Sequence, residues 1–86
     1  MPRISTFYGI VVTMYSSDHA PPHFHARYGE YEAKIMINTG DLLAGQLPPR
    51  AARLVREWAL QHRVELDANW ERAQAREPLA SIEPLP

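Results

Sequence analysis

HFHARYGEYEAKIMI, residues 23–37, contains two strand-like runs that are joined by Gly29 and Glu30. A two-residue link that contains glycine is a strong signal for a β-hairpin. Pairing about this link puts an apolar set on one face, namely Phe24, Ala26, Tyr28, Tyr31, Ala33, Ile35 and Ile37, and a polar set on the other, namely His23, His25, Arg27, Glu32 and Lys34. The stretch therefore predicts an antiparallel hairpin whose apolar face must be covered.

The segments on either side of the hairpin extend the sheet. Residues 7–15, FYGIVVTMY, are apolar on both alternating faces and predict an interior strand. Residues 16–22 contain the adjacent prolines Pro21 and Pro22, which predict a loop that ends at His23. Residues 41–46 predict a short edge strand that Gly45 weakens.

The carboxy-terminal half of the chain has helical periodicity. Pro48 and Pro49 are tolerated at a helix start, and apolar positions follow at three- and four-residue steps up to Leu66. Trp70 falls to one side of this stripe, so we predict a break near Arg63 and a second helix over about residues 64–76. The tail, residues 77–86, contains three prolines and is predicted to be irregular.

These elements predict an α+β fold, in which a three- to four-stranded antiparallel β-meander has a C-terminal helix or helix pair packed on one face. The length of 86 residues suits one core, with a single domain over residues 1–76 followed by the tail. Nothing remains in the sequence to cover the histidine face, which we expect to be open to water or to a partner.

The composition excludes several classes of function. Nine Lys and Arg against ten Asp and Glu give a net charge of -1, so any phosphate contact must be local. The absence of cysteine excludes disulfides and thiol chemistry. The apolar run at residues 7–15 is far shorter than the roughly 18 residues of a membrane span, and we expect a cytoplasmic protein without membrane association.

DHAPPHFH, residues 18–25, is the sharpest chemical motif. His23 and His25 project from one face of a strand, and the proline-stiffened loop could fold His19 back toward them. Imidazoles together with the carboxylate of Asp18, or of Glu32 instead, suit Zn or Ni among other metals. The alternative is that these histidines are surface residues or hold the loop through hydrogen bonds to its backbone.

A metal-free reaction is a second hypothesis for the same residues. His23 and His25 could act as acid and base in phosphodiester cleavage, while Lys34 or Arg27 stabilises the charged phosphorane. Arg27 could instead simply pair with Glu32 across the hairpin. His62 lies on the apolar helix stripe and is predicted to be a core or boundary residue outside the cluster.

Three arginines form a row on the first turns of the predicted helix, Arg50, Arg53 and Arg56. The helix dipole is already positive there, so this placement is consistent with a site for phosphate, RNA or an acidic partner. The alternative is a solvated face on which Arg53 pairs with Glu57.

Several motifs carry a family resemblance: Met1-Pro-Arg-Ile-Ser, Phe7-Tyr-Gly-Ile, Met14-Tyr, His19-Ala-Pro-Pro-His-Phe-His-Ala, Tyr28-Gly-Glu, Gly45-Gln-Leu-Pro, Glu57-Trp, Glu65-Leu and Trp70. Over about residues 1–75 the chain resembles the bacterial family called domain of unknown function 4160. The resemblance implies a small bacterial protein, often encoded beside another small protein in arrangements like toxin-antitoxin or regulatory gene pairs. It implies no established activity.

The leading hypothesis is a noncatalytic binding module of such a pair, which uses the open sheet face and the arginine row to bind a small partner protein, RNA or DNA. The alternative is a His-based ribonuclease or metal-dependent hydrolase centred on His19, His23 and His25, so the question of catalysis stays open. In a third hypothesis the histidine loop is only structural. An exposed strand edge could also pair two copies into a homodimer.

Overall fold

The hairpin predicted at Gly29 and Glu30 is present in the computed structural model, which describes residues 3–86. β3 (His23–Tyr28) and β4 (Tyr31–Met36) pair antiparallel, from Tyr28 opposite Tyr31 to His23 opposite Met36. The predicted register is therefore confirmed. Four members of the apolar set are buried in the hairpin strands, Phe24, Ala26, Ala33 and Ile35, whereas the two tyrosines beside the turn stay exposed.

The sheet has five antiparallel strands rather than three or four. The expected single strand over residues 7–15 is wrong, because β1 (Arg3–Phe7) and β2 (Ile10–Thr13) form a hairpin about Tyr8 and Gly9. These two residues have φ values of 50° and 78°, the left-handed backbone that a tight two-residue hairpin turn requires. The expected strand at residues 41–46 is present as β5 (Leu42–Gly45).

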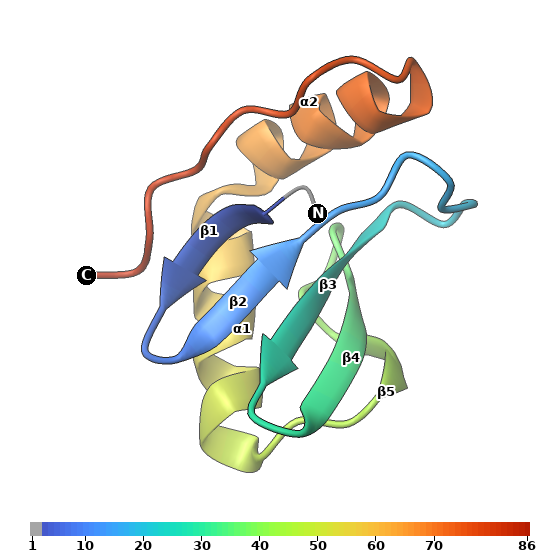
Figure 1. Ribbon diagram of the computed structural model, residues 1–86. Coiled ribbons are helices and arrows are strands. Elements are labelled where there is room, and N and C mark those ends of the chain that lie inside the picture. Colours follow the sequence, from blue (N-terminus) through green and yellow to red (C-terminus); the bar gives the residue numbers. More distant parts are fainter. Residues whose placement is uncertain (1–2) are drawn as a thin grey trace.

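The strands lie in chain order, β1-β2-β3-β4-β5, so the predicted meander is confirmed. Figure 1 shows α1 (Pro49–Gln61) behind the sheet and α2 (Arg63–Gln74) across one end of it. The break between the helices falls at His62, one residue before the predicted position. Neither helix within residues 3–86 is long and apolar enough to cross a membrane.

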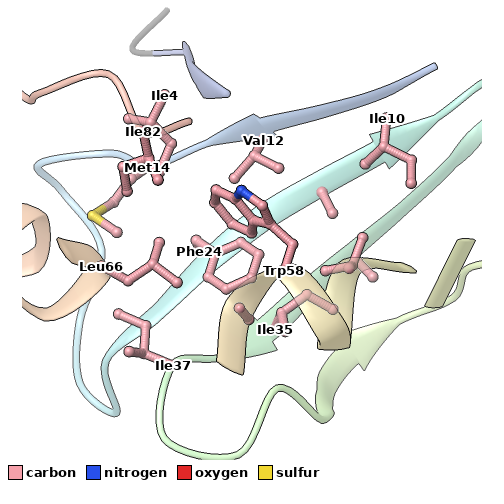
Figure 2. Close-up of a cluster of buried hydrophobic side chains, with 14 of the residues drawn as sticks. Ile4, Ile10, Val12, Met14, Phe24, Ile35, Ile37, Trp58, Leu66 and Ile82 are labelled. Carbon is pink, nitrogen blue, oxygen red and sulfur yellow. The ribbon is translucent and has the colours of Figure 1, made fainter. Parts of the chain in front are cut away.

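The core lies between α1 and the inner face of the sheet (Figure 2). Trp58 is fully buried there, with its ring centroid 5.7 Å from that of Phe24 and 5.2 Å from that of Phe7. Val55, Trp58 and Ala59 lie on the buried face of α1, because residues three and four positions apart share one face of a helix. This is the apolar spacing that predicted the helix. The fold is thus α+β, with the helices packed after the sheet.

Residues 77–86 contain no helix or strand, yet they complete the core. The backbone nitrogen of Ile82 donates a hydrogen bond to the backbone oxygen of Ile4 at 2.8 Å, which ties the tail to β1. Ile82 and Leu85 are buried. Figure 2 shows Ile82 beside Ile4 and Met14 at this edge of the core.

Candidate functional site

The outer face of the sheet is the face opposite α1. Figure 1 shows no helix in front of β2, β3 and β4 on this side. The strand register aligns Thr13, His25 and Lys34 in one row across the face. Arg27 and Glu32 are the cross-strand pair two positions along, and both are exposed. The predicted polar face is therefore open to solvent at Arg27, Glu32 and Lys34, whereas Thr13 is buried and the His25 side chain is 13% exposed.

His23 departs from that expectation, because it is only 4% exposed. The ring of Trp70 in α2 lies 5.4 Å from the ring of His23. In the predicted helix pair, α1 covers the apolar face of the sheet, and α2 also covers one end of the polar face. The expectation that the whole histidine face is open to water is wrong at His23.

Three of the four predicted metal ligands come together. Asp18 Oδ2 lies 2.9 Å from His25 Nε2 and 3.5 Å from His23 Nε2. One ligand atom from each of these three residues lies within 4.8 Å of the other two. His19 is exposed and is not part of this cluster. We call Asp18, His23 and His25 the loop triad.

The hydrogen bonds of His23 define its tautomer. Its Nδ1 lies 2.8 Å from the backbone oxygen of Pro21, and because a carbonyl oxygen can only accept, Nδ1 must be the donor. His23 Nε2 is buried and has no hydrogen-bond partner in the described part of the chain. The loop therefore holds the ring from behind and leaves its second nitrogen directed at Asp18.

The loop that carries Asp18 is anchored to two neighbouring elements. The backbone nitrogen of Asp18 donates to the backbone oxygen of Tyr15, and the side chain of Gln74 in α2 donates to the backbone oxygen of Asp18 at 3.1 Å. The ring of Tyr15 packs edge-on against the ring of His25, with the centroids 4.7 Å apart. These contacts fix Asp18 and His25 relative to the sheet.

Lys34 and Arg27 line hollows beside His25. A hollow of about 270 Å³ is lined by His25, Lys34 and Glu32 among others, and a smaller one of about 20 Å³ is lined by His25 and Arg27. Arg27 and Glu32 are cross-strand partners, yet they form no ion pair among residues 3–86. Arg27 therefore keeps its charge available at the outer face.

The three side chains of the arginine row have different surroundings and do not form one site. The guanidinium carbon of Arg50 lies 5.9 Å from the ring centre of Tyr8, whereas Arg56 pairs with Asp41 at 3.3 Å. Arg53 and Arg56 line a hollow of about 300 Å³ beside β5. Since the three side chains belong to the helix behind the sheet, they do not share a surface with Arg27.

His62 lies outside the loop triad, as predicted. Its Nδ1 is 2.5 Å from Glu65 Oε1, and its ring packs 5.6 Å from that of Trp58. The roles of Trp70 and Gln74 were not predictable from local patterns, because their contacts with His23 and Asp18 join residues far apart in the chain.

A family model described as Domain of unknown function (DUF4160) matches residues 9–71 of the chain. The matched region includes β2, the loop triad, β3, β4, β5, α1 and most of α2. No curated protein and no solved structure matches the chain.

Proposed function

The chain belongs to the family described as Domain of unknown function (DUF4160), and from its geometry we propose that it is a binding module whose outer sheet face binds an acidic surface of a small partner protein. In this proposal the two proteins form a toxin-antitoxin-like or regulatory pair in the bacterial cytoplasm.

The observation that carries this proposal is the uncovered basic sheet face. Arg3, Arg27 and Lys34 are exposed on it, against the single acidic side chain of Glu32 among the residues paired in the strand register. This local excess of positive charge contrasts with the net charge of -1 for the whole chain. An acidic partner surface would complement it, and such complementarity steers association and selects partners.

The position of His23 favours binding over metal-free catalysis. A pair of histidines that acts as acid and base must have both rings within hydrogen-bond reach of the substrate. His23 Nδ1 is occupied by the oxygen of Pro21, and His23 Nε2 is buried beneath the loop. Only His25 lines the hollows at the outer face, so the residue pair needed for this reaction is incomplete there.

Nucleic acid is the second candidate partner, and a different observation favours it. Tyr8, Tyr28 and Tyr31 are 50%, 37% and 42% exposed, and Arg50 lies over the ring of Tyr8. Exposed aromatic rings beside a basic side chain suit stacking of unpaired bases and contact with phosphate. In this candidate the tyrosine end of the hairpins, rather than the outer face, binds single-stranded RNA or DNA.

The test uses a photo-crosslinking amino acid introduced at one position at a time in cells that express the full chain. Position 34 reports on the outer face, position 31 reports on the tyrosine end, and position 53 on α1 is the matched control. All three side chains are exposed, so replacement leaves the core intact. Mass spectrometry identifies whatever is covalently attached.

We expect a discrete protein with an acidic surface to be attached from position 34 and not from position 53. Attachment of nucleic acid from position 31 would support the second candidate instead. Attachment of a second copy of this chain would identify a homodimer. Crosslinks from position 53 alone would overturn both candidates.

A further inference from the structure

We propose that Asp18, His23 and His25 bind a divalent transition metal, and we take zinc as the ion that tests the site. The proposal is independent of the partner-binding proposal, because it rests on the loop triad and not on the outer face. It gives a bound metal ion to His23 Nε2, a buried nitrogen that has no hydrogen-bond partner among residues 3–86.

The first observation is that nitrogen itself. The Pro21 carbonyl fixes the proton of a neutral His23 ring on Nδ1, so Nε2 presents an unshared electron pair. The His23 side chain is 5% exposed, and its Nε2 finds no hydrogen-bond donor within residues 3–86. A buried polar atom without a partner is unfavourable, and such atoms are rare in folded proteins.

The second observation is what the nitrogen faces. Asp18 Oδ2 lies 3.5 Å away, and when His23 is neutral both atoms are acceptors that repel each other. A positive charge between them removes the repulsion. Two candidates exist for that charge: a metal ion that both atoms coordinate, or a second proton on His23 Nε2. With a metal, His25 coordinates the same ion, whereas with a second proton on His23 the His25 Nε2 only donates its 2.9 Å hydrogen bond to the same oxygen.

The spacing fits a small coordination sphere. Zinc binds imidazole nitrogen and carboxylate oxygen at roughly 2.0–2.1 Å, so neighbouring ligand atoms in a tetrahedral site lie roughly 3.3 Å apart. The distances from Asp18 Oδ2 to the two Nε2 atoms, 2.9 Å and 3.5 Å, lie on either side of that value. Small side-chain rotations within the 4.8 Å cluster bring all three atoms onto one ion.

The surroundings hold the ligands in place before a metal arrives. A histidine that binds a metal characteristically donates its other ring nitrogen to a carbonyl or carboxylate, as His23 does to Pro21. Trp70 packs on the His23 ring, and Gln74 holds the backbone of Asp18. This preorganisation lowers the entropy lost when the metal binds.

The donor atoms determine the class of cation. Two neutral imidazoles and one carboxylate suit zinc and related transition metals, whereas calcium and magnesium prefer oxygen ligands alone. For His25 to coordinate through Nε2, the proton of its neutral ring moves to Nδ1, and no net proton is released. Three protein ligands leave one coordination position for water or for a group of a bound partner.

The test is a zinc titration of the full, untagged, chelator-treated chain in competition with a chromophoric zinc indicator. We expect one equivalent of zinc to bind the unmodified chain. Asp18→Asn and His25→Ala each remove one ligand and should weaken binding by at least about tenfold. His19→Ala is the matched control, because it removes an exposed imidazole of the same loop, and it should change the affinity by less than about twofold.

A second measurement uses the unmodified chain, so its result does not depend on whether a variant folds. The ¹⁵N resonances of the imidazole nitrogens report separately on each ring. With one equivalent of zinc, the Nε2 signals of His23 and His25 should move to metal-bound positions while those of His19 stay unchanged. Two results would overturn the proposal: no stoichiometric zinc on the unmodified chain, or a protonated His23 Nε2 that zinc leaves unchanged.

Discussion

The indole nitrogen of Trp58 donates a hydrogen bond to the backbone oxygen of Glu83 at 2.8 Å. The largest fully buried side chain of the core, contributed by α1, is thus satisfied by the irregular tail. An indole N–H that is buried without an acceptor is destabilising, so this bond makes the tail part of the folded unit.

Replacement of Ile82 by alanine should lower the free energy of unfolding by about 2–4 kcal/mol, because it leaves a cavity at the junction of the tail and β1. Urea denaturation followed by tryptophan fluorescence measures this change. Ser81→Ala is the control, since Ser81 is exposed, and it should change stability by no more than about 0.5 kcal/mol. Equal stability of the two variants would show that the tail does not contribute to the core.

Asn69 is fully buried and joins α2 to the tail through both ends of its amide. Its nitrogen donates to the backbone oxygen of Ala80, and its oxygen accepts from the backbone nitrogen of Ala80 and from Arg72. Asn69→Ala leaves these buried groups unpaired and should cost about 1–3 kcal/mol in the same denaturation experiment. Glu71→Ala, on the exposed side of α2, should be nearly neutral.

Gly45 and Gly29 both have positive φ, at 81° and 58°, but their surroundings differ. A β-carbon at Gly45 would overlap the backbone oxygen of Glu32 and lie 2.8 Å from Ala33 Cα, whereas one at Gly29 would meet nothing. Gly29→Ala should therefore cost only the backbone strain, about 1–2 kcal/mol. Gly45→Ala should cost more and loosen β5, which hydrogen exchange of its amides would detect. Similar losses in both variants would contradict the steric explanation.

Zinc should raise the melting temperature of the chain less as the pH falls. Protons compete with the metal for the imidazole nitrogens, so zinc affinity, and with it the stabilisation, decreases in acid. Thermal unfolding with and without zinc, from about pH 7.5 to about pH 5.5, measures the effect. His19→Ala should follow the unmodified chain. A zinc-dependent rise of the same size at both pH values would contradict coordination by His23 and His25.

The sequence predicted those elements whose signal is local. The hairpin register followed from strict alternation on both sides of Gly29 and Glu30, because a shift of one residue would move every apolar side chain to the wrong face. The helix break followed from the position of Trp70 relative to the stripe that contains Trp58.

The turn between β1 and β2, which the sequence analysis did not predict, shows the limit of such patterns. Residues 7–15 are apolar without interruption, and apolar content alone does not reveal a turn. Gly9 was the available signal, since glycine inside a strand pattern often marks a change of backbone direction. The structure resolves the segment into two strands because Tyr8 and Gly9 both adopt positive φ.

The loop triad was predictable only in part: the shared face of His23 and His25 followed from local alternation, as the hairpin did, whereas Glu32 was an alternative to Asp18 and His19 lies outside the triad. His23 and His25 share a strand face at a spacing of two, and Asp18 lies in the adjoining loop. The burial of His23 was not predictable, because it depends on Trp70, which belongs to α2, an element far from His23 along the chain. Long-range packing of this kind leaves no trace in local periodicity.

The chain-ordered strands of the sheet also determine how the protein reaches its folded state. Each strand pairs with its sequence neighbour, so the sheet can grow by one hairpin at a time, with little entropy lost in closing each loop. The bond between Ile82 and Ile4 instead joins the two ends of the described chain and closes a loop that spans almost all of it. We therefore expect the tail to dock after the rate-limiting step, so that weakening it accelerates unfolding and leaves the folding rate almost unchanged.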